Sequence, residues 1–135
     1  MNDFEKIDWN VPDSIKILVT KKNFSSKKDF NISFFGENNY EDTRKNIDFL
    51  TNNFLPSEPY FIKQAHGKKV VNLNKNIFLP YVADGLVTSK RKQVISILTA
   101  DCMPVVISST CGSIICALHI GRKGAEFNII KSAFN

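Results

Sequence analysis

The chain has 135 residues, within the range of one domain, and its 43% hydrophobic and 23% charged residues are typical of a globular protein rather than a disordered or fibrous one. Eighteen basic against thirteen acidic residues give a net charge of +5, but the basic pairs are scattered and no aromatic residues alternate with them. This pattern argues against nucleic acid as the primary partner and fits an anionic small substrate equally well.

The first third of the sequence predicts two short strands and a helix. Alternating and β-branched residues favour a strand over residues 14–20, and a second apolar run favours one over residues 30–36. Asn39 is placed to cap a helix whose first turn carries two acids and whose apolar residues follow at helical spacing. Pro56 ends this helix.

From residue 59 onward the pattern is rich in strands. Apolar and β-branched runs predict strands at residues 60–66, 69–74, 83–88, 93–108 and 113–121. The turn formers that separate them are Gly67, Asn74 to Asn76, Gly85 and Gly112.

The last segment, residues 121–135, predicts one helix with an apolar side. Its apolar residues at helical spacing are Ala125, Ile129, Ile130, Ala133 and Phe134. The helix has neither a terminal glycine cap nor a polar tail, so we expect the sequence to be the N-terminal part of a longer protein. No apolar run approaches the roughly 18 residues of a membrane span and no apolar signal region is visible, so we expect a cytoplasmic protein without a membrane partner.

Two histidines and one cysteine stand at the ends of predicted strands. His66 and His119 each lie next to or near a glycine, and Cys102 interrupts an apolar run between them. The three cysteines of the chain have no secreted context, which favours reduced thiols. Two imidazoles and a thiolate form the ligand set of a catalytic zinc site that keeps one position open, at separations too long for a zinc finger.

The spacing alone leaves other interpretations open. One is two partly buried histidines beside a structural thiol, and another is a Cys–His nucleophilic pair without a metal. Asp101 is a candidate partner for a histidine N–H, although an acid before a turn is as often a cap or a turn former.

A glycine-flanked turn with two cations precedes the last helix. Arg122 and Lys123 lie between Gly121 and Gly124, where backbone N–H groups and positive charge together suit a phosphate. A generic helix start is an equal alternative. Gln64, at a strand end, is a candidate to hydrogen-bond a substrate, though such a glutamine is more often solvated.

Three motifs in this order, "QAHG", "ADGLVTSKRKQVISILTADCMPVVI" and "ALHIGRKG", resemble the signature of the polyphenol oxidase (laccase-domain) family. Its members are read as zinc-dependent purine nucleoside phosphorylases and carry Q-x-H-G-x-x-V, A-D-[AG]…T-A-D-C-x-P-V and H-A-G-W-R-G. The stretch upstream is also similar, so the resemblance spans nearly the whole chain. T-A-D-C-x-P-V is its most specific element.

The resemblance implies an α+β fold, a layered sandwich with mixed β-sheets flanked by helices, present in residues 1–135 as one incomplete domain. It implies that His66, Cys102 and His119 bind zinc, with copper as the alternative. The implied reaction is phosphorolysis of adenosine, guanosine, inosine or methylthioadenosine, with adenosine deamination as a side activity. The implied partners are therefore a purine nucleoside and phosphate, and Lys21 falls where the family has an arginine.

The sequence departs from the family pattern at several positions. Arg122-Lys123 replaces Trp-Arg, Lys21 and Ile47 each replace an arginine, and Asn23-Phe24 replaces a glycine pair. A lysine cannot reproduce the planar two-bond contact of a guanidinium group. Family members are also nearly twice as long, so a non-catalytic remnant or assembly module, associating with itself or with a missing second half, is the alternative of another class.

Overall fold

The computed structural model describes residues 7, 9–22, 24, 29–36, 39–75 and 81–135. It divides into two compact units, Met1–Leu55 and Pro56–Asn135. Within the described residues, no helix combines the length and the apolar character that crossing a membrane requires. Asn23, which replaces a glycine of the family pattern, and Asn76, which is expected in a turn, lie outside the described residues.

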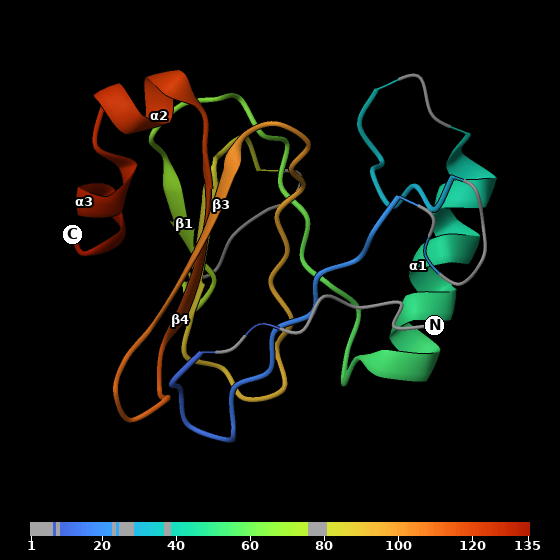
Figure 1. Ribbon diagram of the computed structural model, residues 1–135, viewed down its shortest axis with the longest axis horizontal. Helices are drawn as coiled ribbons and strands as arrows, with labels where there is room; N and C mark the ends of the chain where they lie inside the picture. Colours follow the sequence, from blue (N-terminus) through green and yellow to red (C-terminus); the bar gives the residue numbers. More distant parts are fainter. Residues whose placement is uncertain (1–6, 8, 23, 25–28, 37–38, 76–80) are drawn as a thin grey trace. The chain divides into compact units, whose positions relative to one another are not determined.

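Helix α1, Tyr40–Phe54, organises the N-terminal unit (Figure 1). The Asn39 side-chain oxygen accepts hydrogen bonds from the backbone N–H groups of Glu41 and Asp42, so the helix begins where the sequence predicts. The buried face of the helix carries Leu50, which packs with Phe24 and Phe30 in an apolar cluster. The predicted helix is confirmed.

The two strands expected in this unit do not form. Residues 14–20 contain a single bridge residue at Thr20, and residues 30–36 contain no strand. In residues 30–36 the hydrogen bonding is local: the Asn31 side chain accepts from the Ser33 N–H, and the Ser33 hydroxyl both accepts from the Phe35 N–H and donates to its carbonyl. Polar side chains that satisfy the nearby backbone in this way compete with a strand ladder.

Replacing Asn39 with alanine should lower the free energy of unfolding by about 0.5–2 kcal/mol, because two N–H groups of the first turn lose their acceptor. Urea unfolding followed by circular dichroism measures the loss. Asn52→Ala is the matched control within the same helix. It should be neutral or slightly stabilising, since alanine has the higher helix propensity. Equal effects of the two substitutions would contradict the capping role.

A mixed four-stranded sheet forms the centre of the C-terminal unit, with strand order β1-β2-β4-β3. Strand β1 (Val70–Asn72) runs parallel to β2 (Gly85–Thr88), and β4 (Ile115–Ile120) pairs antiparallel with both β2 and β3 (Met103–Ser108). The structure is therefore α+β with a mixed sheet, as expected.

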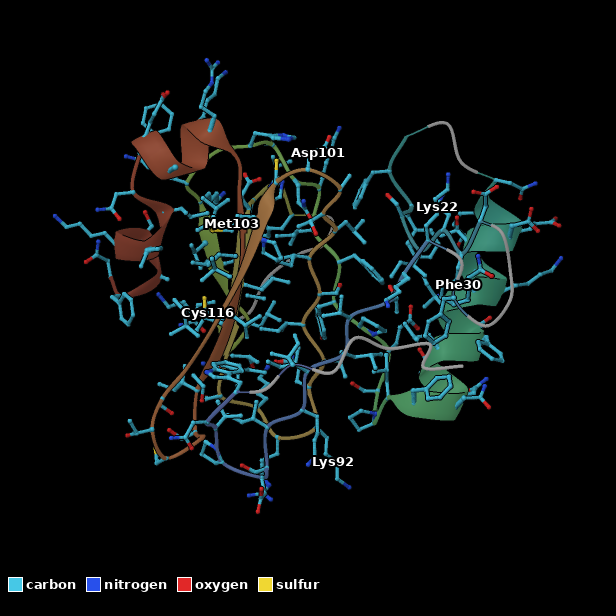
Figure 2. All side chains as sticks on the ribbon, in the orientation of Figure 1. Lys22, Phe30, Lys92, Asp101, Met103 and Cys116 are labelled. Carbon is cyan, nitrogen blue, oxygen red and sulfur yellow. The ribbon has the colours of Figure 1, made fainter. Side chains whose placement is uncertain are left out.

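Two short helices follow β4 and lie beside the sheet (Figure 1). They are α2 (Arg122–Glu126) and α3 (Ile129–Ala133), and Ile129 is buried against Cys116 and Leu118 of β4. Figure 2 shows Cys116 within the side chains of this sheet, whereas Met103 marks the start of β3.

The prediction of one continuous final helix is wrong. Asn128 takes a left-handed conformation, φ 53°, and its side chain accepts from the Lys131 N–H, so it separates α2 from α3 and caps the latter. Asparagine tolerates this conformation better than most residues. Ile129 and Ala133 consequently face the core, but Phe134 on the expected apolar side is 72% exposed.

Two of the expected strands are reduced to isolated bridges. Tyr60 pairs with Ile95 and Lys63 with Val82, and apart from these bridges neither residues 60–66 nor residues 93–102 join the four-stranded sheet. Only the part of the segment 93–108 that follows Cys102 becomes β3.

Candidate metal centre

His66, Cys102 and His119 converge on one point of the C-terminal unit. One potential ligand atom from each lies within 4.8 Å of the others. The ring centroids of His66 and His119 are 4.7 Å apart, and the rings stand nearly perpendicular at 82°. The three side chains differ in solvent exposure: His66 is exposed, Cys102 is half-buried and His119 is only 2% exposed.

The sheet register explains how such distant residues meet. Met103 pairs with Ile120 and Pro104 with His119, so Cys102, one residue before β3, lies at the end of β4 that carries His119. His66 comes from the turn that precedes β1, and it adopts a left-handed conformation with φ 58°. Non-glycine residues rarely take this conformation, and they cluster at functional sites when they do.

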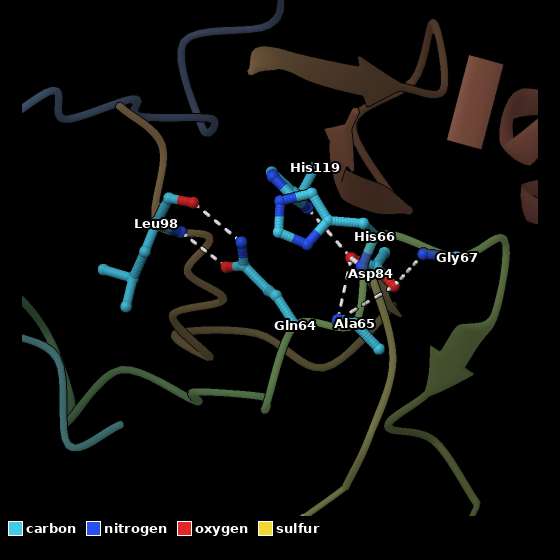
Figure 3. Close-up of polar contacts among 7 residues, drawn as sticks. All are labelled: Gln64, Ala65, His66, Gly67, Asp84, Leu98 and His119. Carbon is cyan, nitrogen blue, oxygen red and sulfur yellow. Dashed lines mark hydrogen bonds and ion pairs between the residues drawn. The ribbon is translucent and has the colours of Figure 1, made fainter. Parts of the chain in front are cut away.

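Asp84 is the residue that the sequence interpretation missed. Its carboxylate is buried to 1% exposure and lies under the cluster, directly before β2 (Figure 3). One oxygen, Oδ1, is 2.9 Å from Nδ1 of His119 and accepts from the His66 N–H at 2.8 Å, while Oδ2 accepts from the Gly67 N–H at 2.7 Å. Asp101, the acid expected to hold a histidine, is exposed in the loop before β3 (Figure 2).

Two opposing effects set the pKa of Asp84. Burial raises the pKa, but the hydrogen bonds from His119 and from the backbone of residues 65–67 together outweigh burial and lower it below its ordinary value. An ionised carboxylate only accepts hydrogen bonds, so its contact with the His119 ring requires the proton on Nδ1, and in the neutral ring that tautomer has its lone pair on Nε2.

The three side chains fit a zinc ion. Two ligands of one zinc ion stand no more than about 4.6 Å apart, because each lies about 2.0–2.3 Å from it. The observed limit of 4.8 Å requires little adjustment. Over the described part of the chain, no hydrogen bond involves the His66 ring or the Cys102 sulfur, so both remain available as ligands alongside Nε2 of His119.

The start of α2 closes over the cluster through glycines. A Cβ added at Gly121 would lie 3.0 Å from Cδ2 of His66 and 3.4 Å from Sγ of Cys102, and one at Gly124 would lie 3.0 Å from the carbonyl oxygen of Gly67. The helix thus approaches the ligands as closely as its backbone permits.

The other residues with expected site roles do not belong to the cluster of His66, Cys102 and His119. The Gln64 amide donates to the Leu98 carbonyl and accepts from the Leu98 N–H, both at 2.7 Å, so it joins two chain segments (Figure 3). Arg122 and Lys123 are exposed in the first turn of α2, directly after Gly121. Lys21 belongs to the N-terminal unit.

The other two thiols, Cys111 and Cys116, differ from each other in exposure and in pKa. Hydrogen bonds, first from Ser113 and then from Ser109, lower the pKa of the exposed Cys111 to about 7, whereas burial raises the pKa of Cys116 to about 11. A lowered pKa means that the reactive thiolate of Cys111 is already abundant at neutral pH.

The alkylation rate of Cys111 by iodoacetamide should therefore rise through pH 7 and level off above pH 8, while Cys116 should stay unmodified until the protein unfolds. Peptide mass spectrometry after timed labelling gives both rates. Ser113→Ala should move the Cys111 profile to higher pH, since the largest cause of the lowered pKa is removed. An unchanged profile in that variant would contradict the assignment.

Known proteins resemble this chain in sequence and in fold. A family model described as multi-copper polyphenol oxidoreductase laccase matches residues 17–135. A purine nucleoside phosphorylase of Rickettsia conorii is 30% identical over 119 residues, covering 88% of this chain and 50% of that protein. One from Haemophilus influenzae is 31% identical over 127 residues, covering 87% and 50%.

A crystal structure of a Neisseria meningitidis protein superposes with a TM-score of 0.83 at 25% identity, covering 98% of this chain and 56% of that one. The chain spans about half the length of the curated relatives it matches.

Proposed function

Because the chain belongs to the laccase-like polyphenol oxidase family, we propose that it carries the metal centre of a purine nucleoside phosphorylase. The observation that supports the proposal most directly is the convergence of His66, Cys102 and His119 within 4.8 Å. The names of the relatives support a purine nucleoside and phosphate as substrates. The finer proposal is phosphorolysis of adenosine, guanosine, inosine or methylthioadenosine, with adenosine deamination as a side reaction.

The proposed metal is zinc, with copper as the alternative. Two imidazole nitrogens and one thiolate suit zinc, and the thiolate also suits copper(I). When bound, zinc supplies Lewis acidity, which polarises an oxygen of the substrate or of water. Cys102 would hold the ion as a thiolate and His66 and His119 as neutral imidazoles, which makes binding weaker at acidic pH.

The cations next to the ligands are proposed to hold phosphate. Arg122 and Lys123 follow Gly121, which lies against His66, so their positive charge is near the cluster along the chain. In phosphorolysis a phosphate oxygen bonds to the ribose carbon as the bond from that carbon to the base breaks. Cations that position the phosphate favour this attack. Lys21, which stands where the family has an arginine, is also proposed as a phosphate-binding residue, and Gln64 is proposed to contact the substrate through its remaining amide N–H.

A metal-free Cys–His hydrolase or deamidase is the second candidate. The pair of Asp84 and His119 beside Cys102 has the acid, imidazole and thiol of a nucleophilic triad. Such a triad needs one imidazole, however, and His66 brings a second ring to the same thiol. The second imidazole favours the metal site.

The proposed function predicts about one zinc per purified chain, together with release of adenine and ribose 1-phosphate from adenosine and phosphate. Elemental analysis and chromatography of the products measure the two, and inosine formation reports deamination. A chelator should abolish both reactions, and zinc should restore them. Turnover that resists the chelator and stops with a thiol reagent would instead favour the Cys–His enzyme. Zinc without any turnover would favour a non-catalytic or assembly module.

A further inference from the structure

One buried carboxylate contacts both histidines of the metal centre from below. Oδ1 of Asp84 accepts from Nδ1 of His119 and from the His66 N–H, and Oδ2 accepts from the N–H of Gly67 (Figure 3). The backbone of Asp84 adds a further link, because its carbonyl oxygen accepts from the His119 N–H at 2.7 Å. His119 is thus attached to Asp84 at its ring and at its main chain.

We propose that Asp84 is the positioning residue of the metal centre, setting the ring of His119 through its side chain and the place of His66 through the backbone of the turn. This proposal rests on the proposed function for its metal, but its geometry is a property of the chain itself. Asp84 is not part of the ligand cluster, which consists of His66, Cys102 and His119. Its proposed action is therefore through the two histidines.

A carboxylate is required because every hydrogen-bond partner of the Asp84 side chain, among the residues that the structure describes, is a donor. The N–H groups of Ala65, His66 and Gly67, together with Nδ1 of His119, all face its two oxygens. An asparagine amide has the same shape but only one oxygen. Whichever way the amide turns, its NH₂ group would face at least one of these donors, and a buried donor would lose its partner.

The negative charge of Asp84 also supports a role at the metal centre. A zinc ion carries two positive charges and the Cys102 thiolate neutralises one, so the carboxylate beneath His119 compensates the other. A carboxylate on the far nitrogen of a histidine ligand also fixes the tautomer and raises the basicity of the ring. Both effects strengthen binding of a cation at Nε2.

The test compares Asp84→Asn with Asp101→Asn, which removes the exposed carboxylate next to Cys102 and is the matched control. Zinc affinity measured by competition with a chromophoric chelator should fall about 10–100-fold in Asp84→Asn, the usual range for such partners, and stay unchanged in the control. The absorption spectrum of the cobalt-substituted protein should also change only in Asp84→Asn. Equal zinc affinity in folded Asp84→Asn and wild type would overturn the proposal.

A second measurement needs neither a variant nor a metal. Nitrogen NMR of ¹⁵N-histidine-labelled, metal-free wild-type protein should show His119 with its proton on Nδ1. A proton on Nε2 would overturn the proposal even if Asp84→Asn fails to fold. Circular dichroism and the unreactive Cys116 thiol verify folding of each variant. If the wild type binds no zinc but has this tautomer, the proposed function fails, whereas the orientation of the His119 ring by Asp84 is retained.

Discussion

Replacing Cys102 with alanine should remove the metal and leave the fold intact. Cys102 is one of the three proposed ligands and the only one that offers sulfur, so its loss should weaken zinc binding more than about 100-fold, beyond the effect of a partner that only orients a ligand. Cys102 is half-buried and lies before β3 rather than in the apolar core, so little packing is lost. Elemental analysis and chelator competition measure the loss, and circular dichroism verifies the fold.

Cys111→Ala is the control for this substitution. Cys111 lies in the turn between β3 and β4 and is exposed, so its removal changes the thiol count without touching the cluster. It should keep about one zinc per chain. Cys102→Ala that still binds zinc at wild-type affinity would show that His66 and His119 do not share an ion with this thiol, and the metal centre would have to be abandoned.

The convergence of the three candidate ligands could be predicted from the sequence, whereas the residue that holds two of them could not. His66, Cys102 and His119 could be named because ring nitrogens and thiols are rare and stood at predicted strand ends. Asp84 could not, because thirteen acids are spread along the chain and only the β2–β4 register places this one under His119. Its available signals were its place in the A-D-[AG] element of the family pattern and its position before a glycine at the start of a buried strand.

The same limit explains the fold predictions that failed. Helix α1 could be predicted because its cap, first-turn acids and apolar spacing are all local. The strands at residues 14–20 and 60–66 had suitable composition, yet whether such a segment joins a sheet depends on long-range pairing that periodicity does not contain. At Asn128 a single left-handed residue divided a helix whose apolar spacing looked continuous.

Replacing Leu118 with alanine should produce the largest loss of stability in the C-terminal unit. Leu118 is fully buried with Cys116 and Ile129, and its methyl group lies so close to Gly85 that a Cβ there would be 2.5 Å away. Removing a buried leucine side chain costs about 2–5 kcal/mol, depending on how far the cavity collapses. Urea unfolding should show this loss, whereas Ile114→Ala, at a site that is 46% exposed, should change stability by less than about 0.5 kcal/mol.

Because of the position of Leu118, its replacement should affect stability without affecting metal binding. Leu118 and His119 are consecutive in β4, so their side chains point to opposite faces of the sheet: Leu118 into the apolar cluster and His119 toward Asp84. Leu118→Ala should therefore unfold more easily yet bind zinc normally while folded, and excess zinc should recover part of its stability by binding the folded state. Loss of zinc affinity in the folded variant would mean that the apolar face fixes His119 as well, and that Asp84 does not position the ring alone.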